Sequence, residues 1–167
     1  MRVKLFILIF FSSIGLLKCQ TNGLSIGDTL PNFSYQGQFA KPYSLKDLKG
    51  SYVLVHYWAS WNEESRKMQQ DFTEPFARYK DRKFKKGRKF YIVSISLDES
   101  PKIWDLSLKK DNLPWRSHVC DFMGWNSPII QKSAIKTIPS NYLLDPNGRI
   151  IAKNIKKDEL EQLLSGF

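Results

Sequence analysis

The side chains that could do nucleophilic, acid–base or metal chemistry are few in this sequence. It holds two cysteines, Cys19 and Cys120, and two histidines, His56 and His118. His118 and Cys120 are two residues apart, a spacing that puts both side chains on one face of a strand. A metal site there would need two or more further ligands, and the sequence offers only His56 and scattered carboxylates. We therefore expect no metal and no cofactor. We interpret Cys120 as an idle, buried thiol, because an unpaired cysteine usually behaves as a small hydrophobe.

A second candidate is the segment WASWNEESR (residues 58–66), which ends a run of strand-forming residues and opens a helical pattern. Its polar centre is Asn62-Glu63-Glu64-Ser65. An amide is no nucleophile, an unactivated serine hydroxyl is a poor one, and no nucleophile-elbow motif surrounds Ser65. Glu63 and Glu64 instead suit the positive end of a helix dipole. The segment is predicted to be an ordinary capped helix start.

The pattern of apolar residues predicts the elements that position these side chains. Residues 52–58 and 90–97 are continuous β-branched and aromatic runs, typical of strands buried on both faces of a sheet. His56 lies within the first run, and we interpret it as a satisfied core residue rather than as a base or a ligand. The other predicted elements are a hairpin within 21–50, a helix from Glu63 kinked near Pro75, a helix over 101–110, a short strand at 117–120, a helix from 127, strands at 142–145 and 149–153 joined by the turn 146–148, and a last helix from Asp158.

The order of these elements indicates the fold class. Strands separated by helices must pair in parallel, whereas a turn as short as Pro146-Asn-Gly148 forces an antiparallel pair. The combination predicts an α/β, thioredoxin-like fold, in which helices flank a central mixed β-sheet and a β-hairpin extends the N-terminus. No internal repeat or linker divides residues 20–167, which we treat as one domain.

Five segments carry a resemblance to a known family. They are Ser44-Leu-Lys-Asp-Leu-Lys-Gly50, Tyr52-Val-Leu-Val-His-Tyr-Trp-Ala-Ser-Trp61, Val93-Ser-Ile-Ser-Leu-Asp98, Ile138-Pro139 and Leu143-Leu-Asp-Pro-Asn-Gly-Arg-Ile-Ile-Ala152. In this order and spacing, across residues 26–164, the chain resembles the exported thiol–disulfide oxidoreductases of the TlpA type. That group is related to the peroxiredoxin-like AhpC/TSA antioxidant proteins.

The resemblance implies a Cys-x-x-Cys motif directly after Trp-Ala-Ser-Trp, where this sequence has Asn62 and Ser65. The chemistry needs one thiolate at a helix N-terminus and a second thiol one turn later to attack the mixed disulfide. Both thiols are missing, and so is the family's nearby proline, since Gln69 and Gln70 stand there. His56 occupies the place of the buried acid that many cytoplasmic thioredoxins keep under the disulfide. We therefore expect no disulfide chemistry at this turn.

Ile138-Pro139 resembles the family's cis-proline corner, which faces the active-site turn and hydrogen-bonds an extended substrate. The resemblance implies a peptide groove formed by Trp61, Asn62, Glu63, Glu64, Ser65, Ile138 and Pro139. We expect a redox-inactive module that binds an extended peptide or an envelope protein, and no nucleic acid. Two alternatives stay open. One is an oxidoreductase or peroxidase-like antioxidant protein working through Cys120 or through a partner's cysteines, and the other is a fold maintained only within a larger envelope assembly.

The first nineteen residues have the pattern of an export signal, with two basic residues followed by the apolar run 5–17. A retained N-terminal anchor is the alternative, although the run is short for a bilayer. Cys19 stands where a bacterial lipoprotein signal places its lipidated cysteine; Leu16-Leu17 fits that motif and Lys18 does not. Cleavage without lipid is therefore the other interpretation. We expect the domain in the periplasm or lipid-anchored in the cell envelope.

The chain is strongly basic. Its net charge of +10 falls to about +7 without residues 1–18. Eight of the twelve residues from Arg78 to Lys89 are Lys or Arg, and no nucleic-acid-binding motif accompanies this run. We interpret the run as a solvated helix end and loop, with attraction to an anionic membrane surface as the next alternative.

Overall fold

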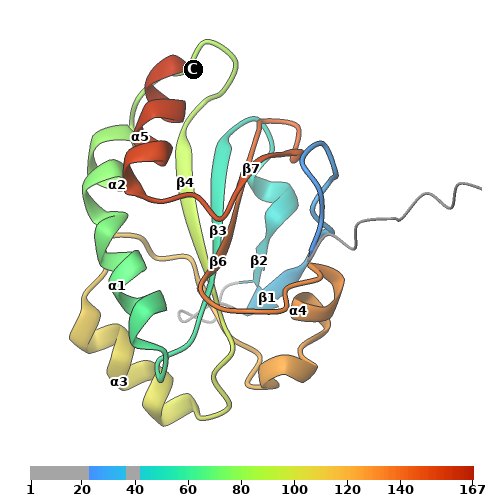
Figure 1. Cartoon of the computed structure of the whole chain (residues 1–167), viewed down its shortest axis with the longest axis vertical. Coiled ribbons are helices and arrows are strands. Elements are labelled where there is room, and N and C mark those ends of the chain that lie inside the picture. The colour runs from blue at the N-terminus through green and yellow to red at the C-terminus, as the bar shows by residue number, and fades with distance from the viewer. Residues whose placement is uncertain (1–22, 37–41) are drawn as a thin grey trace, which may run out of the picture.

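A five-stranded mixed sheet organises the chain in the computed structural model, which describes residues 23–36 and 42–167 (Figure 1). The strands are β3 (Tyr52–Trp58), β4 (Phe90–Ser96), β5 (His118–Val119), β6 (Ser140–Leu144) and β7 (Ile150–Lys153), in the order β5-β4-β3-β6-β7. The first three are parallel, whereas β6 runs antiparallel to both β3 and β7. This mixed sheet confirms the predicted thioredoxin-like α/β fold.

Helices cover both faces of the sheet. They are α1 (Glu63–Asp71), α2 (Thr73–Tyr79), α3 (Pro101–Asp111), α4 (Pro128–Lys132) and α5 (Lys157–Gly166), with two 3₁₀ helices, η1 (Leu45–Leu48) and η2 (Gly124–Asn126). The hairpin predicted near the N-terminus is the antiparallel pair β1 (Ser34–Gln36) and β2 (Pro42–Ser44). The predicted export signal and Cys19 lie outside the described residues. Within the described part of the chain, no helix is long and apolar enough to cross a membrane.

The core lies on both sides of β3, whose seven residues are all buried. Because side chains alternate along a strand, Val55 packs with the layer that holds η1 and α4, and Leu54 packs with the layer that holds α2 and α5. Each such aliphatic side chain contributes about 2 kcal/mol by leaving water. The strand that leads into the candidate turn is therefore held on both faces.

Most element boundaries lie within a residue or two of the prediction, and three of the differences have a clear physical reason. The kink expected at Pro75 is a break at Phe72, and Pro75 then lies in the first turn of α2, where its missing N–H needs no partner. The last helix begins at Lys157 rather than with Asp158 as its cap, because Glu159 accepts the Lys156 N–H at 2.9 Å. β6 begins at Ser140, two residues before the predicted start, since Ser140 pairs with β3.

The two ends of the sheet differ in what they carry. At one end, β3, β4 and β5 finish and β6 begins; we call it the site end. At the other end, β3 and β4 begin, beside the loop of residues 80–89 and the C-terminus; we call it the loop end. In Figure 1 the loop end is at the top of the view and α3 and the start of α1 are at the bottom.

Candidate functional site

The turn after β3 is a capped helix start, as predicted. Asn62 is the N-cap of α1 and has an extended backbone, and its side-chain oxygen accepts the Ser65 N–H at 2.7 Å. This bond satisfies one of the backbone donors that the first helical turn leaves free. Glu63 and Glu64 follow in the first turn, both exposed to solvent. The Asn62 amide therefore has a structural task at the position where the family places its first cysteine.

Ser65 is buried beneath the turn and its hydroxyl is occupied there. The hydroxyl donates to the Asn62 carbonyl oxygen at 2.9 Å and accepts the Ala59 N–H at 3.3 Å. The neighbouring imidazole of His56 contacts the Ser65 carbonyl oxygen rather than the hydroxyl. No base is therefore positioned to activate Ser65 as a nucleophile.

His56 lies fully buried in β3 under α1. Its Nε2 donates to the Ser65 carbonyl oxygen at 3.2 Å, and its ring meets Phe72 edge-on at 5.7 Å. Burial lowers the pKa of His56 to about 4, so the ring is neutral at neutral pH. The ring also interacts with the Ser140 backbone, but Nδ1 makes no hydrogen bond of ordinary geometry among the described residues, and the buried side-chain amide of Gln69 has no partner there. The expectation that His56 is fully satisfied therefore holds for Nε2 alone.

Trp61 and Pro139 both lie at the site end. Trp61 leaves the turn with 62% of its surface exposed, the second most exposed large apolar residue in the described chain. The Ile138–Pro139 peptide bond is cis, as the resemblance implied. Ser140 pairs with Tyr57, which places the proline corner beside the end of β3. The structure thus brings together the turn and the corner that the sequence separates by some 77 positions.

Asp98 ties this turn to the end of β4, a role that the sequence analysis missed. Its buried carboxylate accepts the Ser60 N–H at 3.0 Å, the Ser60 hydroxyl, and the Ser96 hydroxyl at 2.5 Å. Charged acceptors make hydrogen bonds about twice as strong as neutral ones. The carboxylate therefore fixes the backbone directly before Trp61. The only sequence signal was an acidic residue at the carboxyl end of a buried strand.

A second exposed apolar group lies further along the site end. Met123 is 47% exposed and Trp125 is 43% exposed, in the segment between β5 and α4. Gly124, between them, lies so close to Glu99 that an added Cβ would be 2.5 Å from the Glu99 carboxylate oxygen. Because Asp98 holds the turn before Trp61 and Glu99 adjoins Gly124, the two exposed groups lie on successive loops of one end of the sheet. The sequence analysis did not identify Met123 or Trp125.

Cys120 is a buried thiol, in agreement with the burial expected for it. It packs with Trp58, Trp104 and Leu108, and its Sγ donates to the Asp98 carbonyl oxygen at 3.3 Å. Burial raises the pKa of Cys120 to about 11, so the reactive thiolate is scarce at neutral pH.

His118 does not complete a site with this thiol. Its Nε2 donates to the Trp115 carbonyl oxygen at 2.8 Å, and burial lowers its pKa to about 4. In the described residues, no group of three or more His, Cys, Asp or Glu side chains could hold a metal ion.

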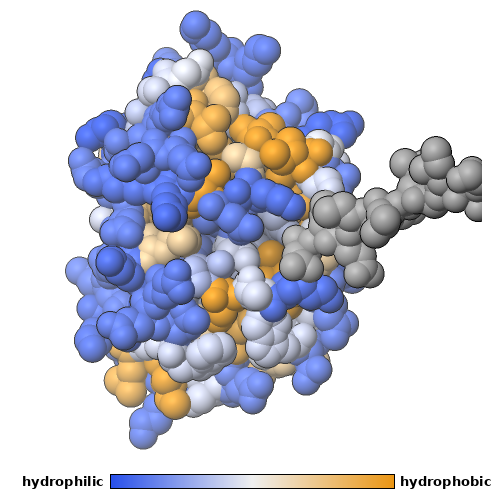
Figure 2. Space-filling model, viewed as in Figure 1, coloured by the Kyte–Doolittle hydropathy of each residue, from blue (hydrophilic) through white to orange (hydrophobic). Residues whose placement is uncertain are grey.

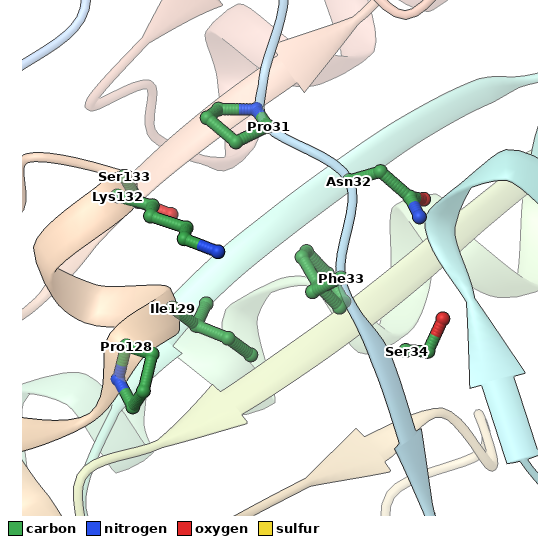
Figure 3. A pocket seen from close by; sticks show the side chains of 8 residues that line it. All are labelled: Pro31, Asn32, Phe33, Ser34, Pro128, Ile129, Lys132 and Ser133. Atoms are coloured by element: carbon green, nitrogen blue, oxygen red, sulfur yellow. The ribbon is translucent and has the colours of Figure 1, made fainter.

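One hollow of about 430 Å³ borders the predicted groove through Glu64, between α1 and the start of α5, and two further hollows lie elsewhere. A pocket of about 210 Å³ separates the N-terminal segment from α4 (Figure 3), and Phe33 and Ile129 point into it. A shallower hollow of about 510 Å³ lies between β7 and α5, where Figure 2 shows hydrophobic side chains gathered. Neither of these two hollows contains a residue of the predicted groove. The candidate site is therefore the exposed surface around Trp61 rather than an enclosed cavity.

Comparison with known proteins agrees with this geometry. A family model described as thioredoxin-like matches residues 50–150, which include the turn, the buried strands and the proline corner. The chain belongs to this thioredoxin-like family.

Its relatives are thiol–disulfide oxidoreductases. The thiol–disulfide oxidoreductase ResA of Bacillus cereus is 26% identical over 140 residues, which cover 84% of this chain and 75% of ResA. The C-terminal domain of a putative thiol–disulfide oxidoreductase from Bacteroides thetaiotaomicron has 32% identity and a TM-score of 0.73, covering 85% of this chain and 95% of that one. The thioredoxin domain of a thiol–disulfide oxidoreductase from Bacteroides vulgatus has 26% identity and a TM-score of 0.76, and the match covers 86% of this chain and 98% of that domain.

Proposed function

We propose that this chain is an exported, redox-inactive thioredoxin-fold module that binds an extended peptide or protein segment at its site end. The observation that carries the proposal is the exposure of Trp61, 62%, on a turn that Asp98 and the Asn62 cap hold in place. A rigid, exposed indole is the type of side chain that dominates binding energies at protein interfaces. Met123 and Trp125 extend the same surface.

The proposal excludes catalysis at the turn for chemical reasons. Thiol–disulfide exchange requires an attacking thiolate and a resolving thiol. The two positions hold an amide and a buried hydroxyl, and both are engaged in hydrogen bonds within the turn. Cys120 is the alternative nucleophile, and its burial and raised pKa oppose that role. Insulin reduction by the native protein that is lost in Cys120→Ser would overturn the redox-inactive assignment.

Binding can be tested without knowing the partner. A phage-displayed library of random linear peptides is selected against residues 20–167, and the enriched peptides are titrated against single variants. We expect Trp61→Ala to weaken the enriched peptides by roughly 30-fold, the effect of losing an interface hot spot of about 2 kcal/mol. Ile26→Ala is the matched control, because Ile26 is 65% exposed and precedes Gly27, whose N–H donates to the Ile150 carbonyl oxygen at the start of β7, away from the site end. Equal binding to both variants, or no enrichment, would refute the proposal.

Export and lipid attachment form a separate part of the proposal. They are supported by the basic and apolar pattern of residues 1–19 and by the position of Cys19. In cells expressing the full chain, we expect the mature protein in the envelope fraction and palmitate incorporation that Cys19→Ser abolishes. Envelope protein without palmitate would indicate cleavage without lipid, and protein retained in the cytoplasm would reject export.

A further inference from the structure

The basic run identified in the sequence forms a fixed turn at the loop end. Seven of the ten residues from Lys80 to Lys89 are Lys or Arg. Phe84 anchors this loop, because it is buried and its ring meets Tyr52 at 5.0 Å. The Phe84 N–H also donates to the Gly87 carbonyl oxygen at 3.2 Å. The basic side chains therefore project from a defined backbone rather than from a loose tail.

Only part of this charge is used inside the molecule. Lys80 and Lys89 both face Asp81, and Arg82 donates to the Leu164 carbonyl oxygen at 3.0 Å. The Arg88 guanidinium donates to the Lys49 carbonyl oxygen.

Four lysines remain at this end, all exposed and none within ion-pair distance of a carboxylate in the described residues; we call them the lysine patch: Lys49, Lys83, Lys85 and Lys86. Arg88 links Lys49 to the loop through that carbonyl contact, so the four charges belong to one end of the molecule.

The patch lies at the opposite end of the sheet from the proposed binding surface. The loop connects α2 to the start of β4, whereas Trp61 follows the end of the parallel neighbour β3. In Figure 1 the loop stands at the top beside the C-terminus, and Figure 2 shows hydrophilic side chains over the same end.

We infer that the lysine patch docks the protein on an anionic phospholipid surface and so turns the site end toward solution. Unpaired lysines attract such a surface without giving up an internal partner. Nucleic acid is the other polyanion to consider, but single strands bind on exposed aromatic rings. Tyr52 and Phe84 are buried at this loop end, and the partly buried ring of Phe167 is already stacked on Tyr52 at 4.4 Å. The inference is independent of peptide binding at Trp61.

The test is sedimentation with vesicles, using residues 20–167 so that the apolar N-terminal run does not insert. All buried core residues lie between Leu30 and Leu164, so this chain keeps the whole core of the described residues. The protein is mixed with vesicles of pure phosphatidylcholine, or of equal parts phosphatidylglycerol and phosphatidylcholine. We expect binding to the anionic vesicles only, weakened by added salt.

Charge reversal locates the contact. Each basic residue near an anionic surface strengthens binding about fivefold, so Lys83→Glu/Lys85→Glu/Lys86→Glu should weaken it on the order of 100-fold or more. The matched control carries the same change in net charge on exposed lysines outside the loop end, as Lys102→Glu/Lys110→Glu/Lys136→Glu. It should lose much less.

Each other outcome would overturn the inference. Failure to bind anionic vesicles would do so directly, and equal losses in the two triple variants would show a general charge effect. Tighter binding of a short RNA, with the same dependence on the loop lysines, would assign the patch to nucleic acid instead. None of these outcomes bears on the peptide-binding proposal, because Trp61 is unchanged in every variant.

Discussion

Asp98 connects the fold to the proposed binding surface, and replacing it should both destabilise the protein and loosen the turn before Trp61. The buried carboxylate accepts the Ser60 N–H, the Ser60 hydroxyl and the Ser96 hydroxyl. In Asp98→Ala all three donors lose this acceptor inside the protein. A buried donor left without a partner costs about 1–3 kcal/mol.

The magnitude follows from which donors can find another acceptor. The two hydroxyls can rotate, whereas the Ser60 N–H is fixed by the backbone. Counting the amide in full and the hydroxyls in part gives a loss of about 3 kcal/mol in the free energy of unfolding. Asp98→Asn keeps one acceptor oxygen and should lose about half as much. Both variants should remain folded, since domains of this size have about 5–15 kcal/mol of stability.

Two measurements check this prediction. Urea unfolding at neutral pH gives the free energy, with Asp105→Ala as the control, because Asp105 forms a partly exposed i,i+4 pair with Lys109 at 2.6 Å. Such a pair contributes about 0.3–0.5 kcal/mol. Hydrogen exchange of the Ser60 amide reports on the turn, and protection there should fall in Asp98→Ala. A loss no larger than that of the control, or unchanged protection at Ser60, would refute the reasoning.

Three further predictions concern the site and the buried titratable groups. Asn62→Cys/Ser65→Cys should catalyse insulin reduction by dithiothreitol, because a helix N-terminus stabilises a thiolate. Single Ser65→Cys should not, and an inactive double variant with an intact fold would show that the site end rejects disulfide substrates. The raised pKa of about 11 should make Cys120 react with iodoacetamide at pH 8 at least ~100-fold more slowly in the folded protein than in urea; equal rates would contradict its burial. His56 and His118 have folded pKa values of about 4, below the 6.5 of the unfolded chain, so the unfolded state binds more protons below pH 6.5. The free energy of unfolding should therefore have its full value above pH 6.5 and should fall by about 3 kcal/mol for each histidine as the pH drops to 4. Comparing urea unfolding at both pH values with His118→Gln isolates one contribution, and an unchanged difference would count against the buried neutral ring.

The buried strands were predictable because their sequences are apolar throughout. β3 and β4 are recognisable as continuous runs, and the short Pro146-Asn-Gly148 turn fixes the antiparallel pair of β6 and β7. The start of β6 was not predictable from its own residues. Asn141 is fully buried there because its amide donates to the Ile155 carbonyl oxygen at 3.0 Å and accepts the Ile155 N–H at 3.0 Å. Those partners lie 14 residues away, beyond the reach of any local pattern.

The candidate site divides in the same way. The capped turn could be predicted because Asn62 and Ser65 bond within one helical turn. The hydrogen bond from the Ser60 N–H to the Asp98 carboxylate joins residues 38 positions apart in the sequence. The close approach of Gly124 to Glu99 depends on how β4 and β5 are paired. Local spacing identifies a helix start, but the surface around Trp61 is assembled by the parallel sheet, which brings the ends of separate strands together.

The substitutions at this turn also change what the turn can do as a surface. In a Cys-x-x-Cys enzyme the two cysteines alternate between a disulfide and two free thiols in each cycle. Here a side-chain amide caps the helix and a hydroxyl bonds the backbone, and neither contact depends on an oxidant or a reductant. Asp98 holds the preceding residue in the same redox-independent way. Trp61 is therefore presented in one fixed setting in oxidising and reducing surroundings alike. That constancy is what the proposed binding surface requires, and the turn itself holds no thiol that could take part in the family's redox cycle.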